Sequence, residues 1–170
     1  MIKRNKYSLL ILIVIGSIVW AACSQQRQPC LTPKIASLNI ECIHKPTDTA
    51  TVFIDTALPA TLFAAFTNSG TQLFIYRNQS ATFTLSLSSD SNSCKWGVTM
   101  DTFGHNFDTL TFFYKRKLQF ISNACGFAYF YNLDSVHTTT KIIDSVHILN
   151  SSVTNNVNTK HLQIYIHPDF

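Results

Sequence analysis

The segment 81–88 alternates strictly between apolar and hydroxyl-bearing side chains, and this pattern constrains the fold more than any other feature. Phe83, Leu85 and Leu87 occupy every second position, with Thr or Ser between them. Successive side chains of a strand point to opposite faces, so the pattern predicts a strand with one buried face. Similar β-prone segments, separated by turn formers, lie at 37–42, 51–55, 72–76, 95–100, 109–114, 118–121, 126–132, 142–149 and 162–166.

About nine or ten short strands of this kind predict an all-β protein, as a single antiparallel β-sandwich of the immunoglobulin-like kind. Composition agrees, because charged residues make up only 13% and Thr, Ile, Val, Phe and Tyr dominate the chain. The segment 56–66 is the one place where we expect a helical turn. The basic run Lys115-Arg116-Lys117 is interpreted as the turn of a hairpin, with contact to anionic lipid headgroups as the alternative.

The N-terminus has the order of a bacterial lipoprotein signal. Lys3, Arg4 and Lys6 precede an apolar, uncharged stretch, which ends in small residues followed by Cys23. We therefore expect residues 1–22 to be a signal peptide, residues 23–29 a lipidated tether and residues 30–170 the β-sandwich domain. Cys23 would carry the lipid, palmitate included. Trp20 departs from the usual Leu three places before the cysteine.

Two other interpretations of this N-terminus remain open. An uncleaved transmembrane helix would need about 18–20 apolar residues, more than the stretch offers. An ordinary secretory signal would leave Cys23 as a free thiol. Removal of the signal also changes the charge: the net +4 of 13 basic and 9 acidic residues includes Lys3, Arg4 and Lys6, so ten basic residues remain against nine acidic ones. This near balance argues against nucleic acid as a partner.

Lipid on Cys23 would leave four cysteines for pairing, as an oxidising compartment favours. Four cysteines allow three connectivities, of which we favour Cys30 with Cys125 and Cys42 with Cys94. We expect no metal site, since no Cys-x-x-Cys occurs and the Cys42–His44 spacing does not suit structural zinc.

The sequence contains no nucleophile-elbow, zincin, P-loop or dinucleotide motif. We therefore expect a non-enzymatic protein without a cofactor. On the last predicted strand His161, Gln163, Tyr165 and His167 alternate with apolar residues, which predicts that the histidines point outward. Three aromatic residues are candidates for stacking on a glycan or lipid: Trp96, Tyr129 and Tyr131.

Triplets of Asp, then Ser or Thr, then an aliphatic residue or Ala recur more often than composition predicts. They resemble the O-glycosylation acceptors of exported proteins from Bacteroides-group bacteria, but the same order suits a turn that leads into a strand. The candidate acceptors are Thr49, Thr56, Thr109, Ser135 and Ser145.

Five parts of the chain together resemble an uncharacterised family of small lipoproteins from Bacteroides-group bacteria, a domain of unknown function. They are the segments 30–34, 108–114, 143–146 and 153–166, and above all 120–127 with its Ile-Ser-Asn-Ala-Cys-Gly-Phe. The resemblance implies a recurring pair of cysteines, and this supports the Cys30–Cys125 pairing. The Cys42–Cys94 pairing is supported only by the even number of cysteines. It implies no activity and therefore no catalytic residues.

The resemblance also implies the location. Surface-exported lipoproteins of those bacteria carry acidic residues just after the lipidated cysteine, and other Gram-negative bacteria retain lipoproteins at the inner membrane by an Asp there. Residues 24–28 have neither, so we expect the periplasmic face of the outer membrane. We expect a membrane-anchored envelope lipoprotein that acts as a protein-interaction or assembly module, with an outer-membrane protein as a candidate partner. A periplasmic glycan- or lipid-binding module is the alternative, and a hydrolase built from scattered residues ranks last.

Overall fold

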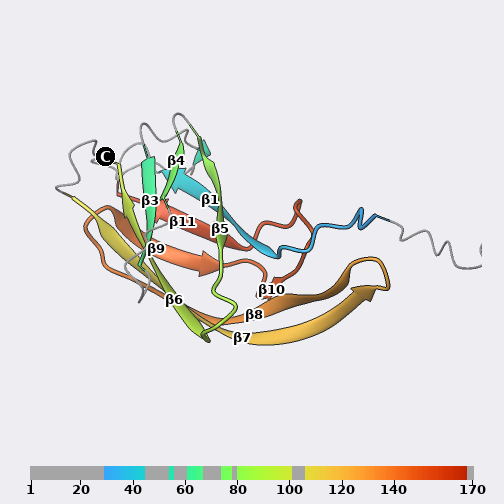
Figure 1. Ribbon diagram of the computed structural model, residues 1–170. Helices are drawn as coiled ribbons and strands as arrows, with labels where there is room; N and C mark the ends of the chain where they lie inside the picture. The colour runs from blue at the N-terminus through green and yellow to red at the C-terminus, as the bar shows by residue number, and fades with distance from the viewer. Residues whose placement is uncertain are drawn as a thin grey trace, which may run out of the picture. The chain divides into compact units, whose positions relative to one another are not determined.

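The computed structural model describes residues 29–44, 54–55, 61–66, 74–77, 80–100 and 106–167 (Figure 1). The chain divides into two units, residues 1–31 and 32–170, and the fold described below is that of the second. The predicted signal peptide and most of the tether lie outside the described residues. So do the lipidation site Cys23 and the candidate acceptors Thr49 and Thr56.

The described residues form strands and no helix, and they therefore also contain no helix long and apolar enough to cross a membrane. The strands are β1 (Ser37–His44), β2 (Ile54–Asp55), β3 (Thr61–Phe66), β4 (Phe74–Arg77), β5 (Thr82–Ser86), β6 (Ser93–Thr99), β7 (Asp108–Ser122), β8 (Gly126–Thr138), β9 (Ile143–Ile148), β10 (Ser152–Val153) and β11 (Leu162–Ile166). The all-β prediction is confirmed for this part of the chain.

The smaller sheet is built around β1. On one side β1 pairs with β11, and β11 pairs with β9; on the other side β1 pairs with β5 and then with β2. The β1–β11 pair is parallel, with Ile40 opposite Leu162. The prediction of a wholly antiparallel structure is wrong here. Parallel neighbours need a long crossover rather than a tight turn, and most of the chain lies between these two strands.

The larger sheet has the order β10-β8-β7-β6-β3-β4 among the described strands, and every pair in it is antiparallel. The inner faces of both sheets contribute to one hydrophobic core, with β1, β5, β9 and β11 on one side and β3, β6, β7 and β8 on the other. In β5 the predicted alternation is confirmed, because Phe83 and Leu85 are buried while Thr82, Thr84 and Ser86 are exposed.

Two local predictions are wrong. The predicted hairpin turn at Lys115-Arg116-Lys117 lies inside β7, which continues to Ser122. The turn falls at residues 123–125 and is followed by Gly126, whose φ of 72° is a left-handed conformation that glycine adopts without strain. The expected helical turn overlaps β3, where buried and half-buried side chains alternate with the period of a strand along 61–65.

The cysteines follow only part of the predicted pattern. Cys30 and Cys125 are both disulfide-bonded. Cys42 and Cys94 are free thiols, so the predicted Cys42–Cys94 bridge is not formed. Cys42 lies beside Ala81, before β5, whereas Cys94 lies beside Ser88, after β5. The two thiols are therefore near opposite ends of that strand, beyond the roughly 7 Å between Cα atoms that a disulfide spans.

Thiol counting will check this correction. Burial, with a smaller contribution from Glu41, raises the pKa of Cys42 to about 12, so that the thiol is not nucleophilic at neutral pH. We expect Cys42 to resist iodoacetamide in the native protein, and both Cys42 and Cys94 to react once the chain is unfolded without reductant. A denatured, unreduced chain in which neither thiol reacts would restore the Cys42–Cys94 bridge.

Candidate functional site

The longest hairpin of the fold continues beyond the rest of its sheet. β6 pairs with β7 only as far as Phe113, and β10 pairs with β8 only at Tyr131 and Asn132. Residues 115–130 are therefore a two-stranded extension, here called the arm, whose strands pair only with each other (Figure 1). Since a two-stranded hairpin is marginally stable alone, its order depends on what holds its base and its tip.

One face of the arm continues the core-facing side of the sheet. The cross-strand pairs Tyr114–Leu133, Leu118–Tyr129 and Phe120–Phe127 lie on the same face, because side chains two residues apart point the same way. Tyr114 and Leu133 are buried in the core. Further out, the same face is open: the exposed fractions are 55% for Leu118, 51% for Phe120, 62% for Phe127 and 39% for Tyr129.

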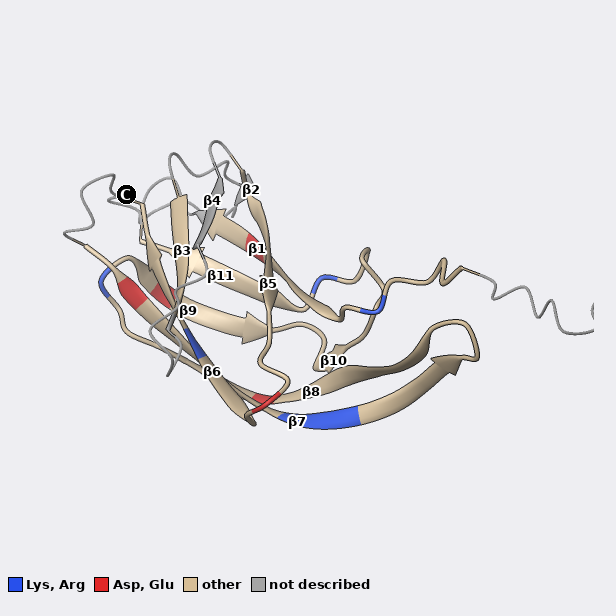
Figure 2. Ribbon diagram, viewed as in Figure 1, with Lys and Arg blue, Asp and Glu red and all other residues tan. Residues whose placement is uncertain are grey.

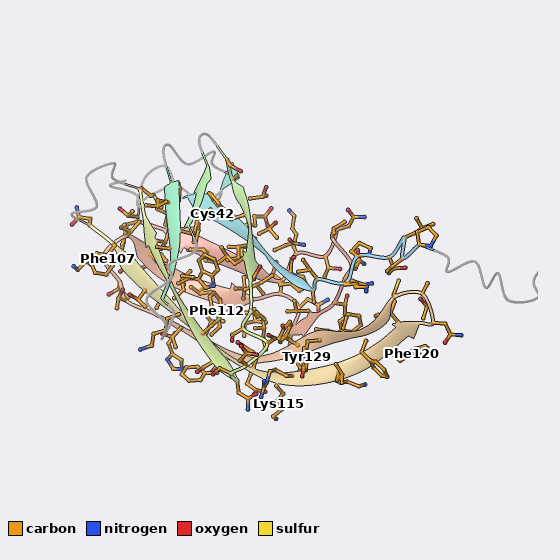
Figure 3. All side chains as sticks on the ribbon, in the orientation of Figure 1. Cys42, Phe107, Phe112, Lys115, Phe120 and Tyr129 are labelled. Carbon is orange, nitrogen blue, oxygen red and sulfur yellow. The ribbon has the colours of Figure 1, made fainter. Side chains whose placement is uncertain are left out.

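These four side chains are here called the arm patch. The Phe120 and Phe127 rings near the tip make an edge-type contact, with 5.3 Å between centroids. Figure 3 shows Tyr129 nearer the body of the domain and Phe120 near the end of the arm. A contiguous group of exposed aromatic and aliphatic side chains is typical of an interaction surface.

The base of the arm is fixed to the loop that follows β5. Arg116 donates a hydrogen bond from Nε to Asn92 Oδ1 at 2.9 Å and a second one to the carbonyl of Ser89. Between this loop and the arm lies an open groove of about 580 Å³, lined by Asn92, Lys115, Arg116, Leu118 and Tyr129. The arm patch therefore begins at the wall of a groove.

A row of carbonyls along the same loop accepts hydrogen bonds from the larger sheet. The indole Nε1 of Trp96 donates to Ser86 O at 3.2 Å, and the hydroxyl of Tyr131 donates to Leu87 O at 3.4 Å. The hydroxyl of Tyr114 donates to Ser88 O at 3.0 Å. Burial, reinforced by the neighbouring Cys94, raises the pKa of Tyr114, so its hydroxyl stays protonated and able to donate.

Two of the three predicted stacking residues are therefore structural. Trp96 is 2% exposed and Tyr131 is 7% exposed, and their polar atoms bind the backbone. Tyr129 alone of the three is open to solvent, beside the groove. The prediction was wrong for Tyr131 because this residue belongs to the hydrophobic core, while Tyr129, two residues earlier, lies in the arm.

The charges of the arm are concentrated at its base. The sequence from Leu118 to Leu133 contains no charged residue, whereas Lys115, Arg116 and Lys117 immediately precede it (Figure 2). Lys115 lies 3.6 Å from Asp134, but both side chains are substantially exposed, so this ion pair contributes little stability. The outer part of the arm is thus uncharged, and the base of the arm is positively charged.

A buried carboxylate anchors the opposite end of β7. Asp108 is 0% exposed and accepts hydrogen bonds from the hydroxyl of Thr139 at 2.6 Å and from the backbone N–H groups of Lys141, Ile142 and Ile143. Burial acts to raise the pKa of Asp108, but these hydrogen bonds outweigh it and lower the pKa. The group thus stays ionised and closes the connection between β8 and β9.

Asp108 also bears on the predicted glycosylation sites. The Asp108-Thr109-Leu110 triplet begins strand β7, and the Asp108 side chain binds the backbone N–H of Ile142. This agrees with the alternative interpretation of the triplets, in which the Asp residue leads into a strand. Thr109, Ser135 and Ser145 are all half-buried and lie within β7, β8 and β9. Whether they carry glycans stays a prediction.

His161 does not point outward as predicted. It is fully buried, and its Nδ1 accepts a hydrogen bond of 3.0 Å from the backbone N–H of Asn39, while Nε2 has no hydrogen-bond partner. Burial lowers the pKa of His161, with partial compensation from the backbone of Ser152, so the ring is neutral. The residue precedes β11, and the alternation of that strand does not extend to it.

The rest of that face does follow the alternation: Gln163, Tyr165 and His167 are half-buried, and Leu162, Ile164 and Ile166 are buried.

The described residues contain no group of three or more His, Cys, Asp or Glu side chains that could hold a metal ion. Sequence reasoning missed Leu118 and Phe120 as site residues. The available signal was the uncharged stretch 118–133, which is longer than a short hairpin strand requires.

The fold and this surface define an all-β domain of two facing sheets with an extended, partly apolar arm. The family model of a family of unknown function (DUF6452) matches residues 61–166, more than half of the chain, and the chain belongs to this family. No curated protein matches the chain, and no solved structure matches it either. The match runs from β3 to β11 and includes the whole arm.

Membership of an uncharacterised family confirms that part of the resemblance described above. The family description assigns no activity, so it adds no functional residues to those that the geometry brings together.

Proposed function

We propose that this protein is a non-enzymatic, membrane-anchored lipoprotein of the bacterial envelope that acts as an interaction or assembly module through its arm. The observation that carries the proposal is the arm patch, where the core-facing side of a sheet continues into solvent with four exposed apolar side chains. Monomeric proteins rarely expose such a contiguous group without a use for it.

The anchor in this proposal is lipid on Cys23, and the location is the periplasmic face of the outer membrane in a bacterium of the Bacteroides group. The support comes from the sequence: the order of charges, apolar residues and small residues before Cys23, and the uncharged Ser24-Gln25-Gln26 after it. O-glycosylation and an immunoglobulin-like form of the sandwich belong to the same proposal. The facing sheets around one core are compatible with that form.

A lipid-binding module is the second candidate. A glycan platform built from Trp96, Tyr129 and Tyr131 is not available, since only Tyr129 is exposed. A lipid surface needs no such platform, and the basic residues at the base of the arm favour it.

Substitution of Cys23 by Ala tests the anchor. We expect the wild-type protein to incorporate labelled palmitate and to sediment with membranes, and Cys23→Ala to lose the label completely because the acylated thiol is gone. Cys94→Ala, which removes a half-buried thiol of the domain, is the matched control and should keep the label. A wild-type chain without label would contradict the lipoprotein assignment.

A further inference from the structure

The observations point to one occupant for the arm patch. We propose that the arm is a membrane-contacting element: its patch enters the interfacial region of a bilayer that contains anionic lipids, and Lys115 and Lys117 face the headgroups. This inference rests on the proposed function, since it names the partner of the same surface. It commits to a lipid surface rather than to a protein.

The side chains of the patch suit a lipid interface. Phe120 and Phe127 lie near the tip and are more than half exposed, while Tyr129, with a polar hydroxyl on an apolar ring, lies nearer the base. Aromatic residues are enriched at membrane interfaces because one part of the ring system is apolar and the other is polar. The order from tip to base therefore follows the change from acyl chains to headgroups.

The charges follow the same order. The arm has no charged residue from Leu118 onward, so its entry into an apolar layer requires no ion to be desolvated. Lys115 and Lys117 are exposed at the base, on the opposite face of β7 from Leu118. The carboxylate of Asp134 lies 3.6 Å from Lys115, which partly neutralises it. The arm therefore has positive charge at its base and an apolar tip. This arrangement is complementary to a bilayer whose surface is anionic and whose interior is apolar.

Fluorescence quenching in vesicles tests the inference. The probe is Phe120→Trp in the mature protein, from Cys23 to Phe170. It is mixed with vesicles of phosphatidylethanolamine and phosphatidylglycerol whose acyl chains are brominated. The native Trp96 is buried at 2% exposure and provides a constant background, which the wild-type protein measures. We expect the emission added at position 120 to fall by about half, as for an aromatic side chain at the level of the acyl chains.

Phe113→Trp is the matched control. Phe113 is 40% exposed, lies on the same strand outside the arm and has the opposite orientation to Tyr114. We expect no quenching there. Lys115→Gln with Lys117→Gln, added to Phe120→Trp, should weaken the quenching, and more so when the phosphatidylglycerol content is low.

The outcomes separate this inference from the proposed function. Absence of quenching at position 120 in protein that sediments with the vesicles would overturn the inference, because the arm patch would then face a protein or a second copy of this chain. Equal quenching at positions 113 and 120 would overturn it as well. Quenching confined to position 120 in a chain that carries no lipid on Cys23 would support the inference while contradicting the proposed anchor.

Discussion

Replacement of Asp108 by Ala is expected to lower the free energy of unfolding by about 3 kcal/mol, since the buried backbone N–H groups of Ile142 and Ile143 and the part-buried one of Lys141 would lose their acceptor, at roughly 1–3 kcal/mol for each buried group. The hydroxyl of Thr139 would also lose its partner. A domain stability of about 5–15 kcal/mol makes this a large fraction of the total. Urea denaturation of the two proteins would measure the difference.

The same carboxylate makes the stability depend on pH. Its pKa is lower in the folded protein than the ordinary 3.8, so its contribution is fully present above that value and is lost as the pH falls through the lower, folded pKa. Asp108→Asn should therefore flatten the acid limb of the stability profile. Asp134→Ala, which removes an exposed carboxylate, is the control and should change stability by less than about 1 kcal/mol. A similar loss in both variants would contradict the role of Asp108.

Replacement of Trp96 by Ala is expected to cost about 3–5 kcal/mol, the range for truncation of a large aromatic side chain in a core. Trp96 is 2% exposed, and its removal would also leave the carbonyl of Ser86 without its indole donor. Tyr129→Ala removes an aromatic ring that is 39% exposed, and we expect a loss of less than about 1 kcal/mol.

The comparison of these two variants tests the distinction between core and surface aromatic residues. Both residues were candidates for ligand stacking on the basis of sequence. Thermal unfolding of the two variants beside the wild type provides the measurement. Equal destabilisation by Trp96→Ala and Tyr129→Ala would mean that the arm patch is held by the domain and is not an interaction surface.

The fold class was predictable because period-two alternation in segments such as 81–88 has one structural meaning, and β5 has the buried and exposed faces that it predicts. The length of β7 was not predictable, because Lys115, Arg116 and Lys117 together have the polarity of a turn. The actual turn carries its signal in Asn123 and in Gly126 with its positive φ. Charged residues inside this strand are stable because Lys115, Arg116 and Lys117 are all exposed to solvent.

The candidate site was predictable only in part. Tyr129 was identified from its residue type, but its exposure, and the burial of Tyr131 two residues later, depend on where the hydrophobic core ends. The pairing of Cys42 with Cys94 failed for a related reason, since an even cysteine count contains no information about distance. The burial of His161 depends on a hydrogen bond from Asn39, which is 122 positions away in the sequence.

The parallel pairing of β1 with β11 has a kinetic consequence. The centre of the smaller sheet joins Ile40 to Leu162, so its closure requires chain segments that are synthesised far apart in time. Domains dominated by such non-local contacts fold in milliseconds to seconds, more slowly than those with local contacts. In a chain that emerges in the order of synthesis, β1 can pair early with β2 and β5, but the edge of β1 that pairs with β11 would stay open until the last strand arrived.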